Sequence, residues 1–213
     1  MVRLSFEGVR TVLCLGAHAD DIEIGCGGTV LRLLRDHPGL QFVWVVFSAE
    51  GRRTREARSS AAAFLAGAGK ARILIKHFRN GFFPFRGEAI KDFFERLKGT
   101  VQPDVVFTHY RDDRHQDHRV LSDLAWNTFR HHVILEYEIP KYDGDLGNPN
   151  LYAELDEALC RRKVELTRKF FQTQGNKHWF SDDTFLALMR LRGVECASST
   201  KYAEAFYARK LLF

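Results

Sequence analysis

The chain has 213 residues, of which 45% are hydrophobic and 28% charged, and its formal net charge is +5. This length is enough for one substantial apolar core, so we expect a single domain over residues 1–213. The 32 Lys and Arg residues are scattered rather than clustered, which argues against nucleic acid as a partner. No apolar run approaches the ~20 residues that cross a bilayer, so we expect no membrane span.

The first residues and the cysteines indicate the cellular compartment. The amino-terminal segment has only a short apolar run that leads into charged residues, so we expect no signal peptide. Cys14, Cys26, Cys160 and Cys196 show neither a CxxC spacing nor a dense disulfide framework. Such usage is typical of proteins in a reducing environment. We therefore expect a cytoplasmic protein.

Strand and helix patterns alternate up to residue 139. Apolar runs of strand length occupy residues 11–17, 41–48, 72–78, 103–109 and 133–139. Segments with helical patterns lie between them, at 28–39, 54–69, 87–99 and 117–131. Because the strands are apolar on both faces, the pattern predicts an α/β fold. We expect a Rossmann-like three-layer sandwich, with a mostly parallel sheet and helices on both faces.

The pattern changes after Pro140. Residues 141–150 have loop chemistry, and residues 156–174 and 181–193 have helical patterns. The segment 201–213 is compatible either with a strand at an edge of the sheet or with a helix.

Two polar turns follow predicted strands. The letters HADD (18–21) come after the first strand, and HYRDDRHQDH (109–118) comes at the end of the fourth. In α/β folds, ligands bind beyond the carboxyl ends of the strands, near a topological switch point. We therefore expect the two turns to face each other across one crevice.

The residue types in these turns suit a catalytic metal. Zinc in hydrolases takes three nitrogen or oxygen ligands and keeps a fourth position for water. His18, Asp21 and His118 would supply such a set for one Zn²⁺, or another divalent metal, per chain. Asp20 and His115 would then be free to move protons or stabilise charge. Zinc lowers the pKa of bound water toward ~7, so a carboxylate base can generate hydroxide at neutral pH. We expect His109, Asp112 and Asp113 to lie beside the site rather than in it.

The two turns together resemble the PIG-L/LmbE-like zinc-dependent N-deacetylases. The resemblance rests on AHADDIEIGCGG and DRHQDH, with EGRRTREARSSAAAFL between them. It covers roughly residues 11 to 139, and YAEAF near the end of the chain is also similar. Ala19 stands where the family usually has proline, which loosens the turn but removes no chemical group.

The resemblance implies roles for individual residues. His18, Asp21 and His118 match the metal ligands, and Asp20 matches the general base. His115 matches the histidine that stabilises the oxyanion and protonates the leaving amine, with Asp117 as its carboxylate partner. Asp117 also has the position of an N-cap for the helix that follows it.

The resemblance also implies a substrate class, an N-acetylated amino sugar of the N-acetylglucosamine type that loses its acetyl group. We expect the loops to bind this small-molecule partner through Arg53, Arg55 and Asp143, since arginine and carboxylate groups suit a charged, hydroxylated sugar. Related proteins are often multimers, so a homo-oligomer is compatible with the chain. Two alternatives stay open: a metallo-phosphoesterase, and a non-catalytic Rossmann-like domain that binds sugars or nucleotides. The segment GCGG (25–28) lacks the GxGxxG pattern of dinucleotide sites.

Overall fold

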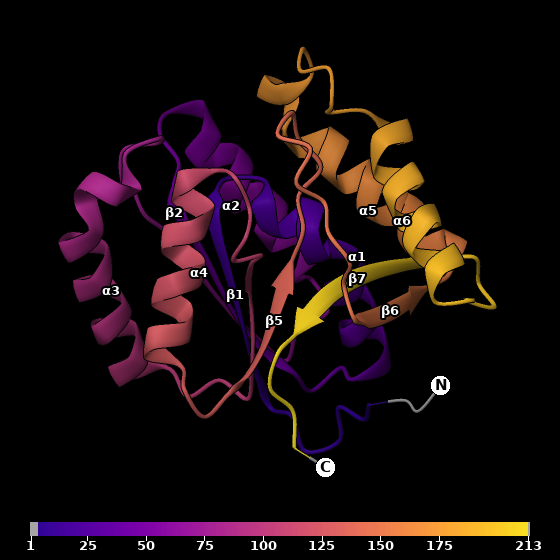
Figure 1. Ribbon diagram of the computed structural model, residues 1–213, viewed down its shortest axis with the longest axis horizontal. Coiled ribbons are helices and arrows are strands. Elements are labelled where there is room, and N and C mark those ends of the chain that lie inside the picture. The colour runs from indigo at the N-terminus through magenta and orange to yellow at the C-terminus, as the bar shows by residue number, and fades with distance from the viewer. Residues whose placement is uncertain (1–3, 213) are drawn as a thin grey trace.

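The computed structural model describes residues 4–212, in which seven strands form one sheet with helices on both faces (Figure 1). The strand order is β3-β2-β1-β4-β5-β7-β6. The predicted α/β fold is confirmed. The strands are β1 (Thr11–His18), β2 (Gln41–Ser48), β3 (Lys70–Ile75), β4 (Val105–His109), β5 (Val133–Tyr137), β6 (Leu151–Leu155) and β7 (Tyr202–Ala208). The helices are α1 (Asp21–Asp36), α2 (Arg52–Phe64), α3 (Gly87–Thr100), α4 (Gln116–Thr128), α5 (Glu157–Phe170) and α6 (Asp182–Glu195), with short 3-10 turns η1 (Phe83–Arg86) and η2 (Gln172–Gln174).

The five strands predicted from their apolar runs are the parallel part of the sheet. β1 pairs in parallel with β2 and β4, β2 with β3, and β4 with β5. β7 is antiparallel to both of its neighbours, β5 and β6. The 201–213 segment, for which strand and helix were both open, thus supplies an interior strand over residues 202–208. β6 was not predicted, because it is short and directly follows loop chemistry.

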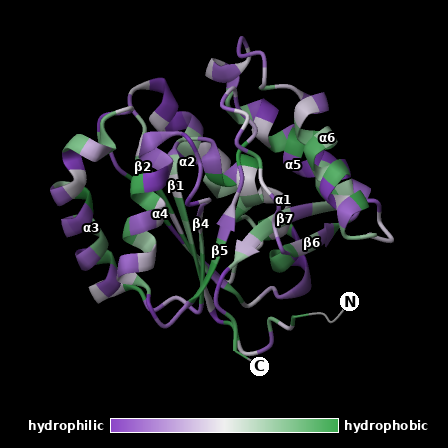
Figure 2. Ribbon diagram, in the orientation of Figure 1, coloured by the Kyte–Doolittle hydropathy of each residue, from purple (hydrophilic) through white to green (hydrophobic). Residues whose placement is uncertain are grey.

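The two faces of the sheet carry separate apolar clusters. Val12 and Cys14 of β1 belong to the cluster under α1, α2, α5 and α6, whereas Leu13 and Leu15 belong to the cluster under α3 and α4. This alternation follows from the opposite directions of successive side chains in a strand. The central parallel strands are predominantly green in Figure 2, as expected for strands buried on both faces. Among the described residues, no helix combines the length and apolarity needed to cross a membrane.

Helix α1 begins earlier than its helical pattern indicates and includes the glycine-rich segment 25–28. A Cβ atom on Gly25 would lie 2.1 Å from the ring of Tyr137, and one on Gly28 would lie 2.5 Å from Leu155. A Cβ atom at either position would force the neighbouring side chain to shift. The glycines therefore allow α1 to pack closely against the sheet.

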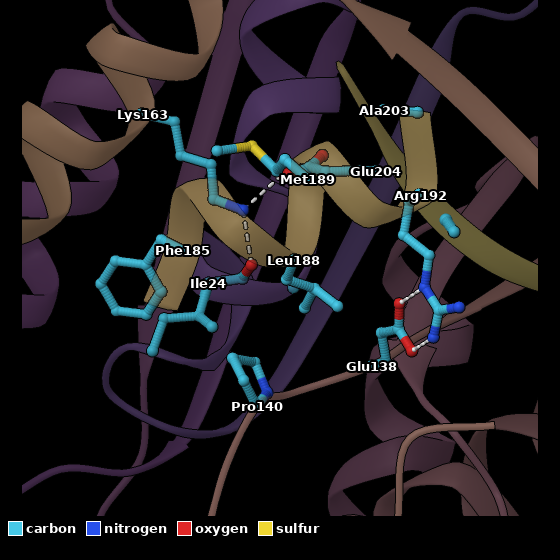
Figure 3. Close-up of a pocket in the computed structure, with 12 residues that line it drawn as sticks. Ile24, Glu138, Pro140, Lys163, Phe185, Leu188, Met189, Arg192, Ala203 and Glu204 are labelled. Atoms are coloured by element: carbon cyan, nitrogen blue, oxygen red, sulfur yellow. Dashed lines mark hydrogen bonds and ion pairs between the residues drawn. The ribbon is translucent and has the colours of Figure 1, made fainter. Parts of the chain in front are cut away.

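A buried ion pair joins α1, α5 and β7 (Figure 3). Lys163 Nζ donates to Glu204 Oε1 and to the carbonyl oxygen of Ile24, both at 2.6 Å. Glu204 also accepts from the N–H groups of Gly28 and Thr29, at 2.9 and 2.6 Å. In a regular helix the Ile24 carbonyl accepts a hydrogen bond from the Gly28 N–H. Lys163 and Glu204 therefore contact the two backbone groups of one hydrogen-bonding position in α1. The adjoining cavity, about 10 Å³, has room for no more than one water molecule.

Candidate active site

The carboxyl ends of β1 and β4 bring the two polar turns together. The two strands are direct parallel neighbours. His18 is the last residue of β1, and α1 begins three residues later at Asp21. His109 ends β4, and α4 begins at Gln116. Residues about a hundred positions apart in the sequence therefore meet at one edge of the sheet.

Three side-chain atoms from these turns form a tight triangle. His18 Nδ1 is 3.2 Å from His118 Nε2 and 3.3 Å from Asp21 Oδ2. Asp21 Oδ2 is 3.6 Å from His118 Nε2. Ligand atoms ~2.0–2.1 Å from a tetrahedral zinc lie about 3.3–3.4 Å from one another. The triangle therefore has the dimensions of three zinc ligands.

Hydrogen bonds on the outer nitrogens orient both rings. His118 Nδ1 is 2.9 Å from Asp113 Oδ2, and His18 Nε2 is 3.2 Å from Asp117 Oδ2. A neutral imidazole that donates its single N–H to a carboxylate presents a lone pair on the other nitrogen. Two lone pairs and one carboxylate oxygen then face one another, which is unfavourable unless a cation lies between them.

The pKa shifts of the three side chains also indicate that positive charge is favoured next to the Asp21 carboxylate. Burial lowers the pKa of His18, but Asp21 and Asp117 outweigh it and raise that pKa to about 10. Burial and His109 lower the pKa of His118 to about 3. Burial raises the pKa of Asp21, yet the surrounding histidines hold it well below its usual range. A proton on His18 or a metal ion would balance this buried carboxylate.

His109 supplies a further nitrogen. It is completely buried, its ring stacks on that of His118 with centroids 3.9 Å apart, and its Nε2 is 3.2 Å from Asp21 Oδ2. Two groups of potential ligands therefore share His118, one with His18 and His115 and one with Asp21 and His109. His109 Nε2 already accepts the N–H of Ala17 at 2.9 Å, which favours a place beside a metal over direct ligation.

Asp20 is buried next to the triangle and has one unused oxygen. Its Oδ1 accepts from the Arg53 guanidinium at 2.7 Å, and its Oδ2 has no hydrogen-bond partner among the described residues. Burial raises the pKa of Asp20, Arg53 opposes that effect, and Asp21 adds to it. Arg53 lies over the ring of Phe171, 5.4 Å from its centroid. The carboxylate is thus held from one side and free on the other.

His115 is the N-cap of α4. Its Nδ1 accepts the N–H of Asp117 at 3.2 Å, and its own backbone N–H donates to Asp113 Oδ1 at 2.7 Å. Burial and the neighbouring His18 lower the pKa of His115. A neutral ring whose Nδ1 accepts carries its proton on Nε2, which makes that nitrogen a donor.

The position of Asp117 corrects two sequence-based expectations. Its carboxylate does not pair with the His115 ring; it accepts from the N–H groups of Gly81 and Phe83, at 2.7 and 3.1 Å, and contacts His18 Nε2. Asp117 is also not the N-cap of α4, since that position belongs to His115. The reason is geometric: the first turn of α4 directs this carboxylate toward the loop between β3 and α3.

The three expected substrate contacts have different positions. Arg53 lies at the site through its bond to Asp20. Arg55 is exposed on α2, and Asp143 is exposed in the turn after β5. Residues 53 and 55 are about 200° apart around a helix, so only one of them can face the crevice.

Two buried carboxylates, Asp113 and Glu23, were not among the predicted functional residues. Asp113 is buried and contacts both His118 and Lys141 Nζ, the latter at 3.0 Å. Two adjacent carboxylates in HYRDDRH were the available signal. Glu23 is completely buried in α1, and burial raises its pKa to about 8 although Ser60 lies close enough to oppose the shift. No sequence signal identified Glu23.

Comparisons with known proteins identify a matching family and similar folds. The sequence pattern of the PIG-L family, GlcNAc-PI de-N-acetylase, matches residues 13–129, a segment that contains both polar turns. The fold is similar to that of N,N'-diacetylchitobiose deacetylase from Pyrococcus horikoshii, with 21% identity, a TM-score of 0.74, and coverage of 96% of this chain and 85% of that one. A conserved protein from Thermus thermophilus gives 21% identity and a TM-score of 0.73, with 95% and 96% covered. The 4-carboxy-2-hydroxymuconate hydratase from Pseudomonas putida gives 16% identity and 0.68, with 96% and 98% covered. The fold alone therefore does not determine the reaction.

Proposed function

The chain belongs to the PIG-L family of de-N-acetylases, and from this membership we propose that it removes the acetyl group from an N-acetylated amino sugar of the N-acetylglucosamine type. The observation that carries the proposal is the triangle of His18, Asp21 and His118, which lies within the matched residues 13–129. We take residues 1–213 as one domain, because every described strand belongs to one sheet. Free, buried cysteines support a cytoplasmic location. A homo-oligomer stays a prediction.

The proposed metal is one Zn²⁺, or another divalent ion, held by His18 Nδ1, Asp21 Oδ2 and His118 Nε2. The short distances among these three atoms and the buried carboxylate are the features that fit it. A divalent metal at such a site supplies Lewis acidity, which lowers the pKa of a coordinated water toward ~7 and polarises an amide carbonyl. Asp113 and Asp117 orient the two imidazoles from the outside.

Asp20 is the proposed general base. Its Oδ2 is buried and has no protein partner among the described residues, so this oxygen is free to accept a proton from the attacking water. The bond from Arg53 to Oδ1 fixes the carboxylate and favours its ionised form. General-base assistance of this kind contributes ~10²–10⁴ in rate.

His115 is the proposed donor to the acetamide oxygen as negative charge develops on it. The Asp117 N–H occupies Nδ1, which leaves the N–H on Nε2 for the substrate. Because the pKa of His115 is lowered, the ring is a neutral hydrogen-bond donor near pH 7. A neutral ring that gave up this proton would become an imidazolate, so His115 would protonate the departing amine only after taking up a second proton, which negative charge on the acetamide oxygen favours.

Arg53 is a proposed substrate contact as well as the partner of Asp20, and the partial exposure of its side chain beside the base supports this role. Arg55 and Asp143 stay predictions for the outer part of a bound sugar.

The test combines metal analysis with acetate release. Purified protein is loaded with Zn²⁺, Mn²⁺ or Ni²⁺ and assayed on N-acetylglucosamine, its phosphate, a nucleotide-linked form and an aliphatic acetamide. We expect one bound metal and acetate release from at least one sugar. His118→Ala should lose both metal and activity, while the control His131→Ala, an exposed histidine of the turn between α4 and β5, should retain both. Metal at unit stoichiometry without acetate release from any amide would contradict the proposal and favour another reaction on this fold. Two bound metals with phosphate-ester hydrolysis would favour the phosphoesterase alternative.

A further inference from the structure

The loop between β3 and α3 presents two phenylalanines to solvent. Phe85 is 78% exposed and Phe82 is 36% exposed, whereas Phe83 between them is fully buried. Phe83 belongs to the apolar cluster under α3 and α4, so the core side of the loop is already filled. Large exposed rings are unfavourable in water, so two of them in one loop suit a surface that a ligand covers.

This loop is fixed directly to the candidate active site. The carboxylate of Asp117 accepts the N–H groups of Gly81 and Phe83, which lie on either side of Phe82 in the chain, and it also contacts His18. Gln116 Nε2 donates to the Gly81 carbonyl at 3.2 Å. Phe82 therefore belongs to a segment held one side chain away from a proposed metal ligand. In Figure 1 the loop that leads into α3 lies at the edge of the sheet where the strands β1 to β5 end.

The exposed rings are paired with each other and with positive charge. The centroids of Phe82 and Phe85 are 6.0 Å apart, with an interplanar angle of 53°. The Arg79 guanidinium lies 3.5 Å from the centroid of Phe82, a cation–π contact. Arg86 is exposed next to Phe85. The surface of the loop thus combines two apolar rings with two guanidinium groups.

We propose that Phe82 and Phe85, with Arg79 beside them, form the subsite for the group attached to the amino sugar, and that this group is an aromatic ring carrying negative charge. The inference rests on the proposed function, because it places the acetamide at the triangle and the attached group on the loop. An aromatic group would stack on Phe85 and cover it. Its carboxylate or phosphate would bind the guanidinium of Arg79, an interaction that a purely apolar surface would not offer.

The test compares three glycosides of N-acetylglucosamine: methyl, phenyl and para-carboxyphenyl. For each, kcat/KM for acetate release is measured with wild-type protein, Phe85→Ala and Arg79→Gln. The wild type should prefer the phenyl to the methyl glycoside by about tenfold, and Phe85→Ala should lower this ratio by ~3–10-fold, the worth of one aromatic contact. The wild type should also prefer the para-carboxyphenyl to the phenyl glycoside, and Arg79→Gln should remove this preference. Leu191→Ala is the matched control, since Leu191 is 51% exposed on α6, away from the loop.

Calorimetric binding of the corresponding glucosaminide products gives a second readout that needs no turnover. Equal kcat/KM for methyl and phenyl glycosides, or a ratio that survives in Phe85→Ala, would overturn the subsite while deacetylation stands. Failure of every glycoside to release acetate would overturn the proposed function, and the inference with it. Sedimentation of the same variants covers the remaining explanation: if Phe85→Ala dissociates an oligomer without changing the ratio, the rings are a contact between copies of the chain.

Discussion

Lys163→Met should destabilise the protein strongly, because it breaks the buried pair with Glu204 and leaves a carboxylate without its cation. Both side chains are about 4% exposed or less. Removing one partner of a buried pair costs about 3–5 kcal/mol, since the remaining charge stays desolvated. The change also leaves the Ile24 carbonyl without the Lys163 donor. The loss would be a large part of a total stability of about 5–15 kcal/mol.

The assay is urea unfolding followed by circular dichroism and by tryptophan fluorescence, in the presence of a chelator so that metal does not contribute. With a slope of about 2 kcal/mol per molar urea, the midpoint should fall by roughly 1.5–2.5 M. Arg35→Met is the control: it breaks the ion pair between Arg35 of α1 and Asp156, whose side chains are 51% and 40% exposed. An exposed pair contributes about 0–1 kcal/mol, so this midpoint should change little.

A double-variant cycle isolates the interaction between the two charges. Lys163→Met combined with Glu204→Met should cost less than the sum of the single changes, because the double variant has no unpaired buried charge. A loss below about 1 kcal/mol for Lys163→Met, or strictly additive losses, would refute the reasoning. Either result would show that water reaches Glu204 or that the helix relaxes away from it.

Asp20→Asn should keep its metal and lose turnover by ~10² or more, as metal analysis and acetate release would show; a rate close to wild type would remove Asp20 from the mechanism. His115→Ala should lower kcat by ~10²–10³ with little change in KM, and a defect confined to KM would make this residue a binding group only. Burial raises the folded-state pKa of Glu23 to about 8, so the folded protein holds a proton that the unfolded chain releases near pH 4–5. Wild-type stability should therefore fall relative to Glu23→Gln by about 1.4 kcal/mol per pH unit between about 5 and 8, and equal slopes in urea unfolding would count against this. Gly25→Ala should lower the melting temperature, because its Cβ would overlap the Tyr137 ring, even though alanine is the better helix former; an unchanged or higher value would show that α1 can shift.

The parallel part of the fold was predictable because its strands are buried on both faces. Such strands are continuous apolar runs, and QFVWVVFS (41–48) has the bounds of β2 without correction. β6 has no such signal: the strand Leu151–Leu155 is only half-buried along most of its length. The end segment was ambiguous because its placement depends on partners, β5 and β6, that lie far away in the sequence.

The candidate site was predictable where both halves of a contact lie at strand ends. The turns after β1 and β4 meet because adjacent parallel strands end at the same edge. The partner of Asp117 was not predictable, since it depends on how the β3–α3 loop folds over the site. The bond between Arg53 and Asp20 depends on the rotation of α2 about its own axis, which fixes whether residue 53 or residue 55 faces inward.

The place of β7 in the sheet has a consequence for synthesis on the ribosome. Among the described strands, β6 pairs only with β7, and all of α5 and α6 is translated between them. At roughly 5–20 residues per second, β6 emerges several seconds before its partner and presents an unpaired edge during that time. Glu204 is part of β7, so the Gly28 and Thr29 N–H groups and the Lys163 ammonium lack this carboxylate partner until β7 has been translated. The amino-terminal strands can assemble early, but α1 reaches its final state only after translation passes residue 204.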